Sequence, residues 1–409
     1  MSNETKKTAL PKLRFPEFRG VGEWEEKALG DVCEVLNNRR KPITGSFREK
    51  GQYPYYGASG IVDYVKDFIF DERLLLVGED GAKWGAFEDT AFIVAGKYWV
   101  NNHAHVLRPR EINEILLEKY LVKLNLAPYV TGAAPPKLTL GKLKTIPVPV
   151  APTRAEQQKI ADALSSLDDL ITAQSAKLAA LQAHKRGLMQ GLFPAEGETV
   201  PKVRFPEFQD SEEWEEKTLG DIATFSSGGT PSKDKPEYWD GDTPWVSASS
   251  MHDYVIDKSE LYITDVAKKA GAAIVGEGVL LLLVRGSMLF KRIPMGITAR
   301  EVAFNQDVKA LHLDKSIAPL YLLYYLVSSE SLLLSKVSAT GIGAGKLDTS
   351  ELKQFPVFIP SPAEQERIVE CLSSIDDRIT AQTQKIQALK LHKKGLMQGL
   401  FPALTATEA

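Results

Sequence analysis

An internal repeat constrains the architecture of this chain more than any single motif does. The stretch "GLMQGLFPA" occurs at Gly187–Ala195 and again, unchanged, at Gly395–Ala403. Around it, residues 151–195 and 359–403 agree at 28 of 45 positions, and residues 11–32 and 201–222 agree at 15 of 22. The stretches between these blocks barely match. The chain is therefore predicted to be two tandem copies of one unit, with a divergent globular block and a shared helical segment in each.

The segments 151–195 and 359–403 each predict one long helix. "TRAE" (Thr153–Glu156) and "SPAE" (Ser361–Glu364) have the spacing of capping boxes, and Gly and Pro end each segment. About 35 helical residues at ~1.5 Å rise span about 50 Å. Apolar residues follow a heptad spacing typical of a coiled coil, at Ile160, Leu164, Leu167, Ile171, Leu178 and Leu181, and at Ile368, Leu372, Ile375, Ile379, Ile386 and Leu389.

One polar residue interrupts each heptad core, at Gln174 and at Gln382. If the helices pack antiparallel, these two glutamines meet and can form a hydrogen bond that fixes register. The alternative is a partly exposed glutamine that packs by its stem. An antiparallel pair would also place the two blocks at opposite ends of the spacer, related by a pseudo-two-fold axis. Such symmetry suits duplex DNA with two half-sites, which should differ because the blocks differ.

The divergent blocks are both predicted to be mixed α/β, because short strand-like runs alternate with many turn residues. Weak correspondences at Asn101/Asn305, Thr131-Gly132/Thr340-Gly341 and Lys137-Leu138/Lys346-Leu347 indicate one shared fold. The predicted domains are a connector (1–22), the first block (23–150), the first helix (151–195), a second connector (196–212), the second block (213–358), the second helix (359–403) and a tail (404–409).

Positive charge is local rather than general. The net charge of −3 excludes a uniformly basic nucleic-acid coat, so DNA contacts must come from clusters of cations. Residues 36–50 and 285–300 form two such clusters, which could bind phosphates or guanine edges. A single surface Lys or Arg is more often only solvated. The predicted DNA-contacting residues are Arg39, Arg40, Lys41, Lys83, Trp84, Lys137, Arg285, Ser287, Lys291, Arg292 and Lys346.

Several stretches carry a family resemblance: "SGGTPSKDKPEYWDGDTPWV", "LLLVGEDGAKWG", "VNNHAHVL", "SSIDDRITAQ" after "EQERI", and "GLMQGLFP". With the two-copy layout, they resemble the specificity subunit of type I restriction-modification systems. The resemblance implies an α+β protein with two target-recognition domains, separated by two long helices packed as an antiparallel coiled coil. Each domain would read one half of a bipartite, asymmetric site in double-stranded DNA.

The same resemblance implies the partners. One copy of this chain would join two methyltransferase (modification) subunits, which dock on the helices and methylate adenine, and two restriction (motor-nuclease) subunits. S-adenosylmethionine, ATP and Mg would bind those subunits, with no cofactor or metal on this chain. The two "GLMQGLFPA" segments are expected to do equivalent docking work at the helix ends. With two cysteines and no signal peptide or long apolar run, we expect a cytoplasmic protein without disulfides or membrane contact.

No catalytic site is visible in the sequence, and the chain is expected not to be an enzyme. One alternative is a metal-dependent nuclease that uses Glu17 with Glu25–Lys27, mirrored by Glu207 with Glu215–Lys217. Their simpler interpretation is a solvated turn before the first strand. A second alternative is a coiled-coil scaffold that binds no DNA.

Overall fold

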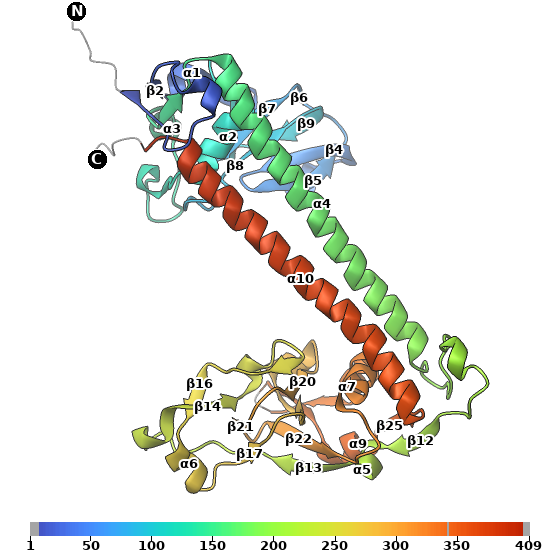
Figure 1. The fold of residues 1–409 in the computed structure, drawn as a ribbon. Coiled ribbons are helices and arrows are strands. Elements are labelled where there is room, and N and C mark those ends of the chain that lie inside the picture. Colours follow the sequence, from blue (N-terminus) through green and yellow to red (C-terminus); the bar gives the residue numbers. More distant parts are fainter. Residues whose placement is uncertain (1–7, 342, 404–409) are drawn as a thin grey trace, which may run out of the picture. The chain divides into compact units, whose positions relative to one another are not determined.

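The computed structural model describes residues 8–341 and 343–403. The chain divides into two units, one made of residues 1–177 and 382–409 and the other of residues 178–381. The boundary falls inside both long helices, α4 (Arg154–Leu192) and α10 (Pro362–Leu400). Each unit therefore contains one divergent block and a part of each helix (Figure 1).

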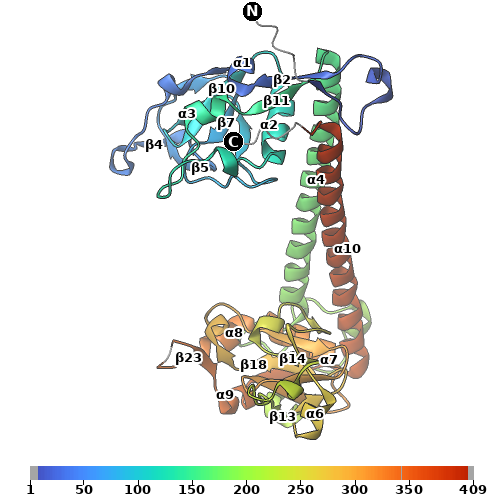
Figure 2. The same ribbon diagram turned by 90° about the vertical axis from the view of Figure 1, so that its left-hand side faces the viewer.

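Helices α4 and α10 have 39 residues each and run side by side in opposite directions (Figures 1 and 2). In the first unit, Asp168 pairs with Lys393 and Gln174 with Gln382, so numbers rise on one helix as they fall on the other. The predicted antiparallel coiled coil is confirmed. The Gln382 side chain is 6% exposed, and its Nε2 lies 2.9 Å from Gln174 Oε1.

Of the two hydrogen bonds of a capping box, the predicted boxes make the one to the Thr or Ser side chain, whereas the glutamate side chain binds elsewhere. Thr153 Oγ1 accepts from the Glu156 backbone N–H at 3.2 Å, as in a capping box. The Glu156 carboxylate, however, binds Arg14 of the first connector, with Nε at 2.7 Å and Nη2 at 2.8 Å. Arg204 makes the same bidentate pair with Glu364 in the second unit, at 2.8 Å for both bonds. The glutamates thus fasten each connector to the start of a helix.

The repeated "GLMQGLFPA" segments end the two helices as predicted, but their apolar residues are buried within each unit. Met397, Leu400 and Phe401 lie in the core of the first unit, where the Phe401 ring packs edge-on against Trp24. Met189, Leu192 and Phe193 lie in the core of the second unit. These six side chains fill the two cores, and docking by the repeated segments stays a prediction.

Over its described residues, the first unit contains three sheets and three short helices besides its parts of α4 and α10. The strand orders are β1-β2-β11, β3-β10-β7-β8 and β5-β4-β9-β6. The strands are β1 (Thr8–Ala9), β2 (Trp24–Ala28), β3 (Cys33–Val35), β4 (Lys50–Gly57), β5 (Gly60–Val65), β6 (Phe70–Asp71), β7 (Leu74–Gly78), β8 (Ala91–Val94), β9 (Lys97–Val100), β10 (Ala104–Pro109) and β11 (Pro147–Val150). The helices are α1 (Leu29–Val32), α2 (Glu114–Lys123) and α3 (Leu140–Lys144), with 3-10 turns η1 (Pro16–Phe18), η2 (Asn37–Arg39), η3 (Gly45–Phe47) and η4 (Ala127–Tyr129).

The second unit repeats this plan with additional strands. The strand orders are β12-β25, β13-β22-β18-β20-β15, β16-β14-β21-β17 and β19-β24-β23. The strands are β12 (Glu215–Thr218), β13 (Ala223–Ser227), β14 (Trp239–Val246), β15 (Val255–Ile256), β16 (Leu261–Ile263), β17 (Ile274–Val275), β18 (Leu280–Leu283), β19 (Arg285–Gly286), β20 (Met295–Thr298), β21 (Val302–Phe304), β22 (Val308–Leu313), β23 (Val337–Ala339), β24 (Gly345–Leu347) and β25 (Pro356–Ile359). The helices are α5 (Leu219–Ile222), α6 (Asp265–Lys269), α7 (Pro319–Ser328), α8 (Glu330–Ser335) and α9 (Thr349–Lys353), with 3-10 turns η5 (Pro206–Phe208), η6 (Pro236–Tyr238), η7 (Ala248–Ser250) and η8 (Ser287–Phe290).

Backbone pairing shows that the two divergent blocks share one fold. Strand β4 pairs in parallel with β9, and β14 pairs in parallel with β21. Directly after these pairs, Asn101 donates its backbone N–H to Tyr56 O and Asn305 to Val246 O, at 3.0 Å in both cases. Each asparagine side chain then accepts from the backbone two residues on. The weak sequence correspondence between Asn101 and Asn305 therefore reflects an equivalent position.

The described helices include none with the length and apolar character that crossing a membrane requires.

Candidate nucleic-acid interface

The predicted cations Arg39 and Arg40 lie between β3 and β4, and both are engaged inside the first unit. Arg39 Nη1 lies 2.7 Å from Glu72 Oε1, and its guanidinium carbon lies 4.4 Å from the centre of the Phe70 ring. Arg40 is 14% exposed and donates to Glu79 Oε2 at 2.5 Å and to the Ala104 carbonyl at 2.7 Å. The Arg40 guanidinium thus holds the loop onto the sheet.

Glu79 is the centre of this buried charge cluster. It accepts from Arg40 and also from Lys137, whose Nζ lies 2.8 Å from Glu79 Oε1. Burial by itself would raise the pKa of Glu79, but the hydrogen bonds from Arg40 and Lys137 outweigh it, and the pKa is lowered. Two predicted DNA-contacting cations therefore balance one buried carboxylate.

His105 lies beside this cluster and is fully buried. Its Nδ1 is 2.8 Å from Asn37 Nδ2, and its Nε2 is 2.7 Å from the Leu138 carbonyl. Because an amide nitrogen donates and a carbonyl accepts, we assign the neutral tautomer with the proton on Nε2. Burial lowers the pKa of His105, which agrees with this neutral form. The ring joins η2 to the loop before α3.

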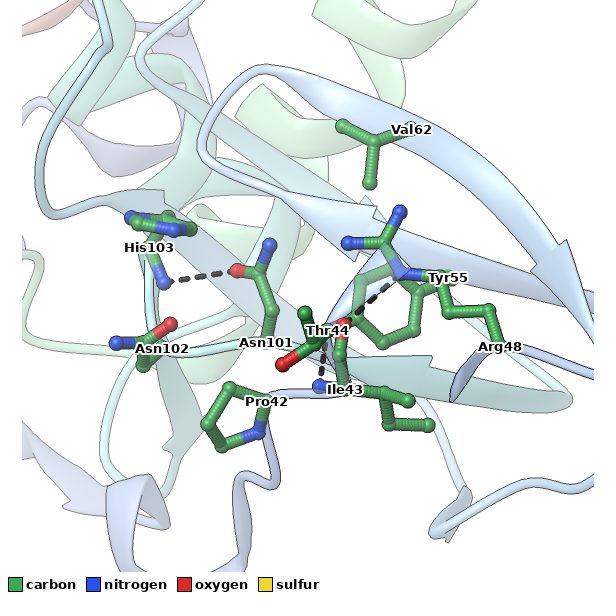
Figure 3. A pocket seen from close by; sticks show the side chains of 9 residues that line it. All are labelled: Pro42, Ile43, Thr44, Arg48, Tyr55, Val62, Asn101, Asn102 and His103. Carbon is green, nitrogen blue, oxygen red and sulfur yellow. Dashed lines mark hydrogen bonds between the residues drawn. The ribbon is translucent and has the colours of Figure 1, made fainter. Parts of the chain in front are cut away.

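An open pocket of about 420 Å³ lies next to this region (Figure 3). Tyr55 forms one side, where its hydroxyl accepts from the Ile43 backbone N–H at 2.9 Å and its ring lies 4.5 Å below the Arg48 guanidinium. The residues that line the pocket are Pro42, Ile43, Thr44, Arg48, Tyr55, Val62, Asn101, Asn102 and His103. Hydroxyl, amide and imidazole groups of this kind can bond to base edges.

The remaining predicted residues of the first unit differ in exposure. Lys41 is exposed. Lys83 is 81% exposed, with its Nζ 3.6 Å from Glu88. Trp84 instead packs against the core and donates its Nε1–H to the Gly78 carbonyl at 3.3 Å. Lys41 and Lys83 are therefore open to a DNA backbone, whereas Trp84 is half-buried.

In the second unit, Arg285 and Lys346 lie opposite each other on β19 and β24. Arg285 is exposed, and Lys346 Nζ lies 2.7 Å from Asp348 Oδ2. The hydrogen bond from Lys346 is the largest cause that lowers the pKa of Asp348 to about 2. Cross-strand neighbours on one face lie within about 5.5 Å of each other. The pair therefore forms a basic surface at the end of β18.

The turn η8 continues this basic surface. Ser287 and Lys291 are exposed, and the Phe290 side chain is 52% exposed. Arg292 differs, because its Nη2 donates to the Met251 carbonyl at 2.7 Å and the residue is half-buried. Arg285, Ser287, Phe290, Lys291 and Lys346 are here called the β19–η8 surface. It contains the aromatic and basic groups that phosphate and base contacts use.

The two units present opposite charge at one equivalent position. In the first unit, Leu138 N–H donates to Glu79 O at 2.8 Å, and in the second, Leu347 N–H donates to Val284 O at 2.9 Å. The next residue is Asp80 in one unit and Arg285 in the other; Asp80 forms an isolated antiparallel bridge with Lys137, and Arg285 on β19 pairs with Lys346 on β24. The same scaffold thus offers an acid in one unit and a cation in the other.

The residues of the nuclease alternative form no site. Within residues 8–341 and 343–403, no cluster of His, Cys, Asp and Glu could hold a metal ion. Glu25–Lys27 and Glu215–Lys217 are not a turn, as the simpler interpretation had it, but lie within strands β2 and β12. Lys27 binds Glu111 at 2.6 Å, and Lys217 binds Glu215 at 2.9 Å. These charges serve local ion pairs.

Sequence reasoning missed the pocket residues Arg48, Tyr55, Asn102 and His103. Arg48 lies within the cation cluster of residues 36–50, and Asn101 is one of the weak correspondences between the blocks, but neither pattern predicts a pocket. The useful signal was the run "VNNHAH" directly after a predicted strand, since polar residues at strand ends often form sites. Contact of any of these residues with DNA stays a prediction.

Comparison with known proteins identifies the relatives of this fold. The family model described as type I restriction modification DNA specificity domain matches residues 22–183 and 211–391. A putative type I restriction enzyme specificity subunit of Haemophilus influenzae is 40% identical over 36% of this chain and 38% of its own length. The EcoR124I/EcoR124II specificity subunit of Escherichia coli is 29% identical over 61% of this chain and 60% of its own length. These alignments span less than two thirds of either relative.

Solved structures agree on the fold. The type I restriction-modification S subunit from M. genitalium aligns with a TM-score of 0.62, 15% identity, and coverage of 97% of this chain and 100% of that one. A chain from a study of complex assembly and conformational transition of the type I system aligns with a TM-score of 0.55, 15% identity, and coverage of 92% and 97%. At this identity, the likeness concerns the fold.

Proposed function

Since the chain belongs to the family of type I restriction modification DNA specificity domains, we propose that it is a specificity subunit that reads a bipartite, asymmetric DNA site. The observation that carries this proposal is that two blocks of one fold present different side chains at equivalent positions, such as Asp80 and Arg285. Two readers of one architecture and unlike surfaces suit two unlike half-sites. A scaffold would need no such contrast.

The proposal extends to the partners. Two modification subunits would bind the chain and methylate adenine within the site, and two restriction subunits would add translocation and cleavage. The chain itself would hold no cofactor and catalyse no step, with S-adenosylmethionine, ATP and Mg bound by its partners. One copy per complex would work in the cytoplasm, where chromosomal DNA lies. The proposed DNA contacts come from the β19–η8 surface and from the pocket region of the first unit.

Methylation mapping tests this function. The chain is co-expressed with the modification subunit of its own system, and methylated adenines are mapped across the host genome. We expect one motif with two unlike halves and a fixed gap. Replacing residues 33–140 with the corresponding block of a family member of different specificity should change one half only. A complex that assembles but methylates no defined motif would contradict the proposal, and a block exchange that alters both halves would contradict the division of labour.

A further inference from the structure

Phe47 is the most exposed large apolar side chain in the described part of the chain, with 79% of its surface accessible. It ends the 3-10 turn η3, between the pocket residues Thr44 and Arg48. An aromatic ring left this open to water contributes nothing to the core. A single exposed apolar side chain is common and is no evidence by itself, so the case for a binding role rests on how Phe47 is held and on what surrounds it.

The loop that carries Phe47 is held at several points. Trp99 donates its Nε1–H to the Lys41 carbonyl at 2.5 Å, and the Ile43 N–H donates to Tyr55 at 2.9 Å. The Arg48 side chain donates from Nε to the Ile43 carbonyl at 3.0 Å and from Nη1 to Asp63 Oδ2 at 3.2 Å. The ring is therefore presented by a braced turn. Such preorganisation reduces the entropy lost when a side chain engages a ligand.

The surroundings of Phe47 favour nucleic acid over an apolar protein partner. Lys41 is exposed on the same loop and Lys50 at the start of β4, and the adjoining pocket offers Thr44, Asn102 and His103. Cations bind phosphates, and small polar side chains bond to base edges. Phenylalanine next to such groups is typical of proteins that wedge a ring between base steps.

The second unit lacks this feature at the equivalent loop. The loop after β13 contains Lys233 and Lys235, and Trp239, at the start of β14, packs back against this loop. Trp239 donates its Nε1–H to the Ser232 carbonyl at 3.1 Å, and its ring packs edge-on against Trp245. At this loop a wedge is therefore available in the first unit and not in the second, whose exposed ring, Phe290, lies elsewhere in η8.

We propose that Phe47 stacks against an opened base step in the half-site bound by the first unit. This inference rests on the proposed function, because it needs DNA on that unit. The unstacking would add sequence preference without base-edge contacts, since flexible pyrimidine–purine steps open at lower cost than others. At the half-site read by the second unit, the equivalent loop supplies no such wedge.

The test uses the full chain with its modification subunit and duplexes that carry 2-aminopurine at successive positions of the mapped motif. This base fluoresces more strongly when it loses its stacking neighbours. With wild type, we expect a rise at one step of the half-site assigned to the first unit, in addition to the rise at each adenine that a modification subunit extrudes for methylation. Phe47→Ala should abolish the rise at that step and weaken binding roughly ten- to hundredfold, whereas Phe47→Leu should keep most of the rise.

Val266→Ala is the matched control, since this side chain is 51% exposed and lies on α6 of the second unit. Val266→Ala should change neither the DNA affinity nor the 2-aminopurine fluorescence. Unchanged affinity and fluorescence in Phe47→Ala would overturn the inference while the proposed function stands. Loss of co-purified modification subunit, with normal DNA signals in the remaining complex, would also overturn it and place Phe47 in a protein interface. A wild-type complex that selects no bipartite site would instead refute the proposed function, and the inference with it.

Discussion

Gln382 donates its side-chain Nε2 to both the side-chain oxygen and the main-chain oxygen of Gln174, at 2.9 Å each. The two residues hold the same place in the two copies of the repeat, 208 positions apart. A polar pair inside an apolar seam penalises any shift of one helix along the other, because a shifted amide would be buried without a partner. The pair therefore specifies the register of the coiled coil.

Replacing Gln174 with Leu should lower the free energy of unfolding by about 0.5–1.5 kcal/mol, because one hydrogen bond to buried Gln382 is lost. Gln384→Leu is the control, since Gln384 lies on the same helix and is exposed. It should change the unfolding free energy by less than about 0.5 kcal/mol. Urea denaturation of the full chain measures both. Equal changes of unfolding free energy in Gln174→Leu and Gln384→Leu would show that the Gln174–Gln382 pair does not stabilise the coiled coil.

Removing the ion pair between Arg14 and Glu156 should lower the free energy of unfolding more than Gln174→Leu does. The two side chains are 7% and 0% exposed, and the Trp24 indole also donates to Glu156 at 3.1 Å. Glu156→Ala leaves the guanidinium buried without its partner, which costs about 3–5 kcal/mol. Glu17→Ala, which removes an exposed pair with Lys159, should cost less than about 1 kcal/mol. Denaturant unfolding of both variants distinguishes the buried pair from the exposed one.

Two glycines of the repeated segment allow a matched comparison. A Cβ atom at Gly399 would lie 2.5 Å from Leu13 Cδ1, whereas one at Gly395 meets nothing within 4 Å. The connector cannot simply move away, because Leu13 N–H donates to the Gly399 carbonyl at 2.8 Å. Gly395→Ala should stabilise the helix by up to about 1 kcal/mol, and Gly399→Ala should destabilise the unit by about 1–3 kcal/mol. Melting temperatures that rise in both variants would contradict this packing.

The helices could be predicted from sequence because their signals are local. Heptad spacing, caps and the Gly–Pro ends all lie within one continuous segment. The sheets could only be predicted as a class, because their pairings are not local. Strand β3 pairs with β10, more than sixty residues later, and no short motif encodes that register.

The candidate site was predicted in part for the same reason. The sequence predicts a cation-rich loop at residues 36–50, whose contact with DNA stays a prediction, but which of its cations remain available depends on distant acids. Glu72 and Glu79 engage Arg39 and Arg40 from strands that the loop meets only in the fold. In contrast, Arg285 and Lys346 were predicted from separate stretches, and the pairing of β19 with β24 brings them together.

His105 should make the first unit less stable in mild acid. Burial lowers its pKa in the folded state below the ordinary value of 6.5, whereas the unfolded chain keeps that ordinary value. The unfolded state therefore takes up a proton first, and the stabilising contribution, complete above pH 6.5, is lost as the pH falls through the folded pKa. His105→Gln can still donate to the Leu138 carbonyl but does not titrate. Its unfolding free energy should fall less than that of wild type between about pH 7 and pH 5, above the range where carboxylates titrate. If the unfolding free energies of wild type and His105→Gln fell by the same amount over this pH range, the lowered pKa of His105 would be contradicted.

Salt dependence separates cations that bind DNA from cations that hold the fold. Each phosphate contact contributes about 0.9 to the slope of log affinity against log salt. Arg285→Gln should therefore reduce this slope by about 1 and leave the melting temperature unchanged, because Arg285 lies exposed on β19. Arg40→Gln should instead lower the melting temperature, because it leaves Glu79 buried with one bond fewer. Binding titrations at several salt concentrations, with the full chain and its modification subunit, measure the slopes. A lower slope in Arg40→Gln at unchanged stability would assign Arg40 to the DNA, and an unchanged slope in Arg285→Gln would remove the β19 strand from the interface.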